Sequence, residues 1–236
     1  MRKAYSVILL LAVVVTGCSQ RGPEQSLFDQ QLDCALALAQ EYGPITEAIA
    51  RQTAEEFDGV ATEINYKSPE SAERKCQTDS CMPFDLKDLA RTTVVATWDS
   101  AAVGEVVEFL ITITTEQELF GRYKHQTSDY GYWGDIVNLQ FDSLMTEIQV
   151  KTYGMFYAAD PEQMVRETIG DDKYDYIYSV TGVEPGMAHV YYEVIRADTS
   201  SEATIAHYKQ LSREYFRILQ SITPPEKKMP ANTLTR

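Results

Sequence analysis

One loop, reading Asp-Tyr-Gly-Tyr-Trp-Gly-Asp from Asp129, combines the residue types best suited to holding a ligand. Tyr130, Tyr132 and Trp133 cannot all be buried easily in a loop, and exposed aromatic rings stack on sugars or anchor a protein partner. Asp129 and Asp135 flank the rings, where carboxylates accept hydrogen bonds or pair with a basic ligand. The loop is the predicted ligand-binding site. The alternative is a turn whose rings fold back over the edge of a sheet.

Catalytic motifs are absent from the sequence. Its three histidines are His125, His189 and His207, and none belongs to an HExxH, a GxSxG or a glycine-rich phosphate loop. We therefore expect no catalytic residue, no cofactor and no metal site. An envelope hydrolase remains the alternative, because a Ser-His-Asp site is assembled by folding and leaves no fixed spacing in the sequence.

The cysteines suggest a disulfide. Cys76 and Cys81 are close in sequence and are predicted to pair, which leaves Cys34 reduced and buried as a small apolar side chain. A bridge from Cys34 to the later loop is the alternative. No CxxC pair occurs, so neither a thioredoxin-like site nor a four-cysteine zinc site is indicated.

The first residues have the features of a secretory signal. A basic start precedes an apolar run that is shorter than the ~20 residues of a membrane span. The segment Val15-Thr16-Gly17-Cys18 resembles the lipobox of bacterial lipoproteins. That resemblance implies an acylated Cys18, with palmitate among its chains, that anchors the protein in a membrane. The residue after Cys18 is not Asp, which implies the periplasmic face of the outer membrane if the source has two membranes.

The chain is acidic, with a formal net charge of −14. Such a charge disfavours nucleic acid and fits a basic partner. We expect a lipid-anchored envelope protein that acts as a non-catalytic binding, accessory or inhibitor-like module for a protein or a cell-wall glycan. The partners would be the membrane, through Cys18, and a basic protein or glycan. An immunity protein against a basic toxin is a further alternative.

Composition divides the chain into a signal peptide (1–17), a tether (18–26), one domain (27–223) with a helical first part (27–90), and a flexible tail (224–236). Periodicity predicts two helices that Gly43-Pro44 separates into a hairpin. Five strands are predicted next, at 92–98, 106–115, 119–124, 136–141 and 145–153. A helix, a β-hairpin and a long helix follow, at 160–170, 174–195 and 199–221.

This order predicts an α+β fold with an antiparallel sheet of about six to eight strands. A helical hairpin would precede the sheet and a long helix would close it. The final β-hairpin and helix are similar to those of the Mog1/PsbP-like sandwich of sheet and helices.

Overall fold

The computed structural model describes residues 26–197 and 199–224. The predicted signal peptide, Cys18 and nearly all of the predicted tail lie outside them. The helices are α1 (Leu27–Glu56), α2 (Pro69–Asp79), α3 (Val103–Glu116), α4 (Tyr153–Ala159), α5 (Glu162–Ile169), α6 (Asp171–Thr181), α7 (Met187–Arg196) and α8 (Glu202–Gln220). The strands are β1 (Val60–Ala61), β2 (Asn65–Tyr66), β3 (Ala90–Thr97), β4 (Phe120–Thr127), β5 (Trp133–Phe141) and β6 (Leu144–Thr152), and the 3-10 turns are η1 (Pro83–Asp85) and η2 (Ser100–Ala102).

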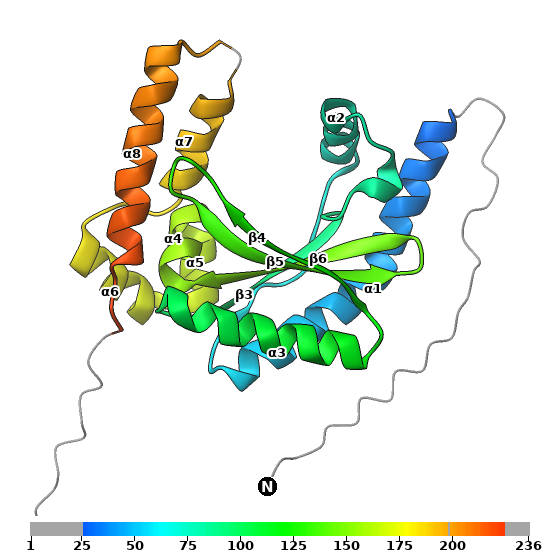
Figure 1. The fold of residues 1–236 in the computed structure, drawn as a ribbon, viewed down its shortest axis with the longest axis horizontal. Coiled ribbons are helices and arrows are strands. Elements are labelled where there is room, and N and C mark those ends of the chain that lie inside the picture. The colour runs from blue at the N-terminus through cyan, green and yellow to red at the C-terminus, as the bar shows by residue number, and fades with distance from the viewer. Residues whose placement is uncertain (1–25, 198, 225–236) are drawn as a thin grey trace, which may run out of the picture.

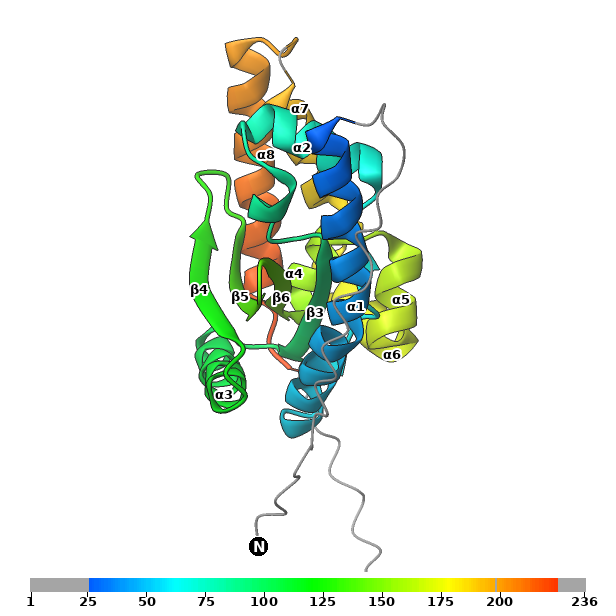
Figure 2. The same ribbon diagram turned by 90° about the vertical axis from the view of Figure 1, so that its right-hand side faces the viewer.

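The fold is α+β, as predicted, and its six strands form one sheet in the order β1-β3-β6-β5-β4, with β2 also paired to β3. The sheet is mixed, because β3 and β6 run parallel while the other pairs are antiparallel. Figures 1 and 2 show α1 and α3 against one side of the sheet, with α2 and the α7–α8 pair rising on the other. No helix in the described ranges is long and apolar enough to cross a bilayer.

The two faces of the sheet differ in chemistry, because successive side chains of a strand point to opposite faces. On β6, Ile148 and Val150 are fully buried in a core with α1 and α3. Glu147, Gln149 and Lys151 point the other way. A second core lies among α4, α5, α6 and α8 at one end of the sheet.

The first helix is unbroken, so the predicted helical hairpin is wrong. Pro44 lies inside the 30-residue α1 and removes only one helical hydrogen bond. Gly43 is needed for close packing, since a Cβ there would collide with the ring of Tyr66. Burial of one continuous stripe on both sides of Pro44 outweighs the local preference of Gly-Pro for a break.

Three predicted strands are helices. Residues 106–115 belong to α3, where Val103, Val106, Val107, Leu110 and Ile113 are buried with helical spacing despite their β-branched character. The predicted final hairpin is replaced by α6 and α7, with Gly182 in the left-handed conformation that ends α6. The hairpin that carried the Mog1/PsbP resemblance is therefore not formed. The strands β3 to β6 and the long helix α8 are confirmed within a few residues.

Candidate active site

The predicted aromatic loop joins β4 to β5 and packs against α8. Gly131 has a φ of 94°, and a Cβ there would lie 3.1 Å from the Cα of Arg213. Tyr132 meets Phe216 edge to face, with 5.9 Å between ring centroids, and Trp133 packs against both cores. The rings thus fold back over the end of the sheet, and ligand binding by this loop stays a prediction.

The tip of this loop is tied to the α7–α8 pair. Lys209 of α8 lies 2.6 Å from the Asp129 carboxylate. The ring of Tyr130 lies 6.2 Å from that of Tyr192 on α7. These contacts place Asp129 and Tyr130 against α8 and α7.

Asp135, predicted to flank exposed rings, is buried, and its carboxylate already has partners within the fold. It is 5% exposed, accepts a hydrogen bond from the Tyr123 hydroxyl at 2.5 Å and lies 2.9 Å from His125 Nδ1. Burial, reinforced by Asp135, raises the pKa of Tyr123 to about 12. By register, these side chains share the Val150 face of the sheet, opposite Glu147.

The histidines do not form a catalytic triad with the partners that the structure gives them. His189 lies 3.6 Å from Glu193 on α7, and His207 packs edge-on against Tyr208 on α8. Neither these contacts nor that of His125 joins a histidine to a Ser or Thr hydroxyl.

The cysteines differ from the predicted arrangement. Cys76 and Cys81 are free thiols, although the Cys81 amide donates to the Cys76 carbonyl at 3.0 Å where α2 ends. Cys34 is disulfide-bonded rather than reduced. The structure therefore does not contain the predicted pairing.

The exposed face of the sheet instead carries a row of polar side chains that sequence reasoning missed. Cross-strand pairing aligns Arg122 of β4, Asn138 of β5, Glu147 of β6 and Arg91 of β3. Asn138 is fully buried, accepts from Arg122 Nε at 2.9 Å and donates to the Thr146 carbonyl at 3.2 Å. A continuous polar row across four strands, part of it buried, makes this face a candidate functional site.

Glu147 is the buried carboxyl group of the row. It is 9% exposed, and burial raises its pKa, with the nearby charge of Asp88 adding to the effect. Gln149 donates to Glu147 Oε1 at 2.7 Å and holds the carboxyl group in place. A carboxyl group with a raised pKa takes up a proton more readily than an exposed one.

Asp88 lies beside Glu147 in the opposite electrostatic situation. Lys75 of α2 lies 2.8 Å and Lys67 lies 3.1 Å from its Oδ2. Burial alone raises the pKa of Asp88, but the two lysines outweigh it and hold the pKa below its usual value. Its Oδ1 is buried without a hydrogen-bond partner among the described residues. A buried carboxylate oxygen left open in this way is suited to a ligand.

A third buried charge completes the cluster. Lys151 is 6% exposed, and its Nζ lies 3.6 Å from Asp160 Oδ2, too far for a hydrogen bond. Burial lowers the pKa of Lys151, and Asp160 opposes that effect only in part. Asp160 Oδ2 also lacks a hydrogen-bond partner in the described part of the chain.

A pocket of about 850 Å³ adjoins the polar row. Arg91, Thr93 and Asp160 belong to its lining, so it opens beside the charged cluster. The rest of the wall comes from residues 60–66, from α1 and from α5, and includes Arg51, Tyr66, Met164 and Glu167. Such a pocket is large enough for a nucleoside or a ligand of similar size.

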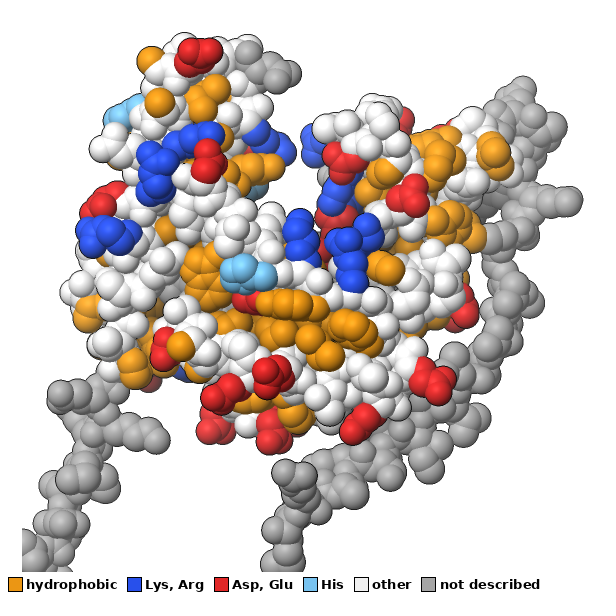
Figure 3. Space-filling view, in the orientation of Figure 1, with side chains coloured by type: hydrophobic (Ala, Val, Ile, Leu, Met, Phe, Trp, Pro, Cys, Tyr) orange, Lys and Arg blue, Asp and Glu red, His pale blue; other side chains and the backbone are white. Residues whose placement is uncertain are grey.

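Cations gather on this side of an acidic protein. Figure 3 shows the molecule hollowed between two raised lobes, with Lys and Arg side chains on the floor and walls. Lys124 follows Arg122 on the same face of β4. Among the described residues, no group of three His, Cys, Asp or Glu is placed to hold a metal ion. The hollow is therefore suited to a phosphorylated ligand.

No protein-family model matches the sequence. The chain is 29% identical over 174 residues to the (p)ppApp synthetase toxin Tas1 of Pseudomonas aeruginosa (strain UCBPP-PA14). The aligned stretch covers 72% of this chain and 38% of that protein, so this chain spans well under half of its relative. The fold is similar to a chain in the crystal structure of the complex between the Type VI effector Tas1 and its immunity protein. The TM-score is 0.67 at 26% identity, over 81% of this chain and 97% of the other.

These similarities correct the functional expectations. The related protein is a synthetase, so the expectation of a binding module without catalysis is wrong. The relative is a toxin, so the expected role as an accessory or inhibitor-like lipoprotein and the immunity-protein alternative are also wrong, while the lipobox and the envelope location stay predictions. The similar fold occurs in a complex with a protein, which replaces the membrane as the expected kind of partner.

Proposed function

We propose that the hollow is the active site of an enzyme that transfers a phosphate-containing group between adenosine nucleotides and forms products of the (p)ppApp type. The observation that carries the proposal is the Asp88–Glu147 pair: Lys67 and Lys75 bind Asp88, and Arg91, whose charge acts on Glu147, also lines the nucleoside-sized pocket. The similarity to a (p)ppApp synthetase supplies the reaction class.

The charges suit both nucleotides of such a reaction. Lys67, Lys75 and Arg91 neutralise the phosphates of one nucleotide whose nucleoside enters the pocket. Arg122 and Lys124, at the other end of the row, attract the phosphates of the second nucleotide. The row thus lies between two phosphate-binding groups.

Glu147 is suited to accept a proton. In the proposed transfer, a hydroxyl oxygen of the acceptor forms a bond to phosphorus of the donor, and the bond from that phosphorus to the leaving nucleotide breaks. The hydroxyl proton must leave, and a carboxylate with a raised pKa is a competent base. Gln149 orients this carboxylate through its 2.7 Å hydrogen bond.

A divalent cation carried by the nucleotide fits the same pair. Mg²⁺ is usually held by one or two carboxylates together with substrate phosphates. The open Oδ1 of Asp88 provides such an oxygen, which leaves the neighbouring Glu147 to act as the base. When bound, the ion would neutralise negative charge on the phosphates.

Product formation from ATP with AMP, ADP or a second ATP tests the proposal, with ion-pairing chromatography and mass spectrometry as the readout. We expect Asp88→Asn and Glu147→Gln to lower kcat/KM by about 100-fold or more, because the first removes the carboxylate proposed to hold the cation and the second removes the proposed base. Asp172→Asn, an exposed carboxylate on α6, is the matched control and should keep full activity. Failure of the wild-type chain to form any new adenosine phosphate would refute the proposal.

By the same similarity, we propose that this activity is toxic to cells and that a partner protein neutralises it. Growth arrest on induced expression, relieved by Asp88→Asn, is the expected result. An Asp88→Asn protein that arrests growth as strongly as the wild type would contradict the proposal.

A further inference from the structure

The wall of the pocket contains a β-bulge. Val60 and Ala61 pair with Val95 and Val94 of β3, and Asn65 pairs with Arg91. The backbone amide of Thr62 donates a hydrogen bond to the Thr93 carbonyl at 2.9 Å. Glu63 and Ile64 therefore stand opposite Thr92 alone, so this segment carries one extra residue. A bulge leaves backbone groups without their partners in the ladder and redirects the strand.

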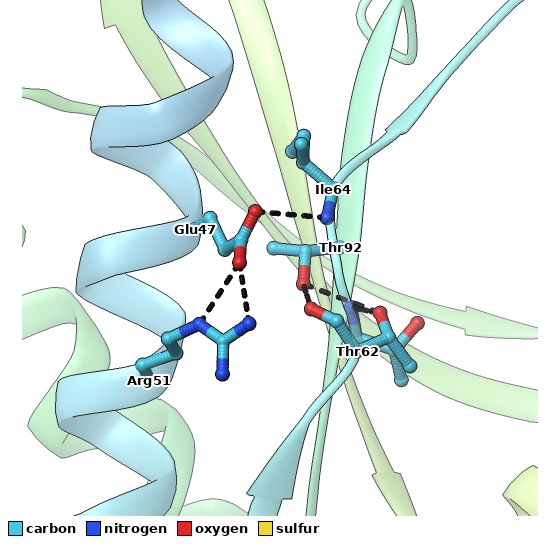
Figure 4. A network of polar contacts seen from close by, with 6 residues as sticks. Glu47, Arg51, Thr62, Ile64 and Thr92 are labelled. Carbon is cyan, nitrogen blue, oxygen red and sulfur yellow. Dashed lines mark hydrogen bonds and ion pairs between the residues drawn. The ribbon is translucent and has the colours of Figure 1, made fainter. Parts of the chain in front are cut away.

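A glutamate of α1 satisfies the amide that the bulge releases. Glu47 Oε2 accepts a hydrogen bond from the Ile64 amide at 3.1 Å. Its Oε1 binds Arg51 at 2.9 Å through Nε and at 2.6 Å through Nη2. Figure 4 shows Glu47 placed between the helix and the bulged strand, with Arg51 below it.

The bulge is held on its other side by threonines. The Thr92 hydroxyl donates to the Thr62 carbonyl at 2.7 Å (Figure 4). The Thr93 amide donates to Thr62 Oγ1 at 3.0 Å. Burial alone raises the pKa of Glu47, but Arg51 and the Ile64 amide outweigh it and lower the pKa. Glu47 is therefore ionised at neutral pH and makes a charge-assisted hydrogen bond.

The bulged segment connects the two parts of the candidate site. Residues 60–66 all line the pocket, as does Arg51. The next residue, Lys67, lies 3.1 Å from Asp88 and donates its amide to the Leu89 carbonyl at 2.9 Å. The path of the bulge thus determines both the shape of the pocket and the position of Lys67.

We propose that Glu47 is a positioning residue that fixes the bulge at 62–64 and thereby holds the nucleotide-binding wall and Lys67 in place. This inference rests on the proposed function. Glu47 acts through the Ile64 amide and through Arg51, and it contributes to binding the nucleotide whose nucleoside enters the pocket rather than to the transfer step. A binding role predicts a change in KM with little change in kcat.

Steady-state kinetics and hydrogen exchange together test the proposal. Glu47→Ala removes both interactions and should raise the KM for ATP about tenfold, with kcat within about twofold of the wild type. Hydrogen exchange of the 60–67 peptide should become faster. Glu47→Gln keeps an oxygen that accepts from Ile64 but loses the charge that holds Arg51, so its effects should be intermediate. Glu41→Ala, an exposed glutamate of the same helix, is the control and should change neither readout.

Arg51→Ala provides a second approach if Glu47→Ala does not fold, because it frees Glu47 without burying an unpaired amide. It should raise the KM for ATP and speed exchange of the same peptide. An active wild type with Glu47→Gln and Arg51→Ala both unchanged in KM would overturn this inference alone. A loss of kcat at constant KM in the Glu47 variants would also overturn this inference. An inactive wild type would instead refute the proposed function.

Discussion

Asp88 and Glu147 are neighbouring carboxyl groups whose surroundings drive their pKa values apart. Two lysines stabilise the charge on Asp88, whereas burial penalises the charge on Glu147. A site with one firmly ionised carboxylate, able to hold a cation, and one carboxyl group that takes up a proton more easily can bind a cation–phosphate complex and accept a proton in the same place. The cost is borne by the folded state, because a buried charge without full compensation lowers stability.

Glu147→Gln should therefore stabilise the protein while it removes activity. The folded-state pKa of Glu147 is raised, so its destabilising effect is absent below the unfolded pKa, grows as pH rises from the unfolded to the folded pKa, and is constant above the folded pKa. We expect the variant to gain about 1 kcal/mol in free energy of unfolding at pH 8 and almost nothing at pH 4. Urea denaturation at both pH values is the measurement. A gain that is equal at both would show that charge burial is not its source.

At the scale of elements, local sequence predicted the strands better than the site. The alternation on β5 and β6 identified both strands, because one of their faces is buried against α1 and α3. In α3 and α6, β-branched and tyrosine residues favoured strands locally, and burial with helical spacing overrode that preference. The polar row could not be predicted, because it requires knowing that β3 pairs with β6.

One sign of the site was nonetheless present in the sequence. On β6, the polar half of the alternation consists of Glu147, Gln149 and Lys151. Such a pattern is typical of a strand with one face in solvent. The structure places Glu147 and Lys151 at 9% and 6% exposure instead. Sequence alone cannot tell a polar face in solvent from one under a cleft, because both produce the same alternation.

The turn between β4 and β5 is predicted to contribute to stability. Trp133 packs against both cores, so Trp133→Ala should cost about 2 kcal/mol or more of unfolding free energy. Tyr130→Ala at the tip of the same loop is the control and should cost less than about 1 kcal/mol. Chemical denaturation of both variants decides the matter. A Trp133→Ala protein as stable as the wild type would contradict this prediction and would support the interpretation of Trp133 as an exposed ring that binds a ligand.

At the scale of the molecule, a net charge of −14 opposes the entry of anionic nucleotides. The cations of the hollow act at short range, while carboxylates such as Glu105, Glu108 and Glu116 of α3 lie exposed on the opposite side of the sheet. Salt at physiological strength screens exposed charges beyond ~8 Å. It therefore weakens the repulsion from the distant glutamates more than the attraction of the cations next to a bound nucleotide.

Replacing these three α3 glutamates by glutamine should therefore lower the KM for ATP about twofold at low salt, by reducing long-range repulsion. The difference should vanish at about 0.5 M salt. Kinetics at two ionic strengths measure it, and an effect that persists at high salt would point to a structural cause.

A row of four polar residues on four strands also determines how the domain can be divided. Its members are Arg122, Asn138, Glu147 and Arg91. The left-handed Glu118 marks the turn between α3 and β4. A cut there leaves Lys67, Lys75, Asp88 and Arg91 on one fragment and the other three members of the row on the second. Neither fragment alone would hold a complete site, and the parallel β3–β6 pairing is the seam along which the two would rejoin. With the proposed activity, the domain is suited to a split reporter, in which two inactive fragments regain activity only when the proteins fused to them bind each other.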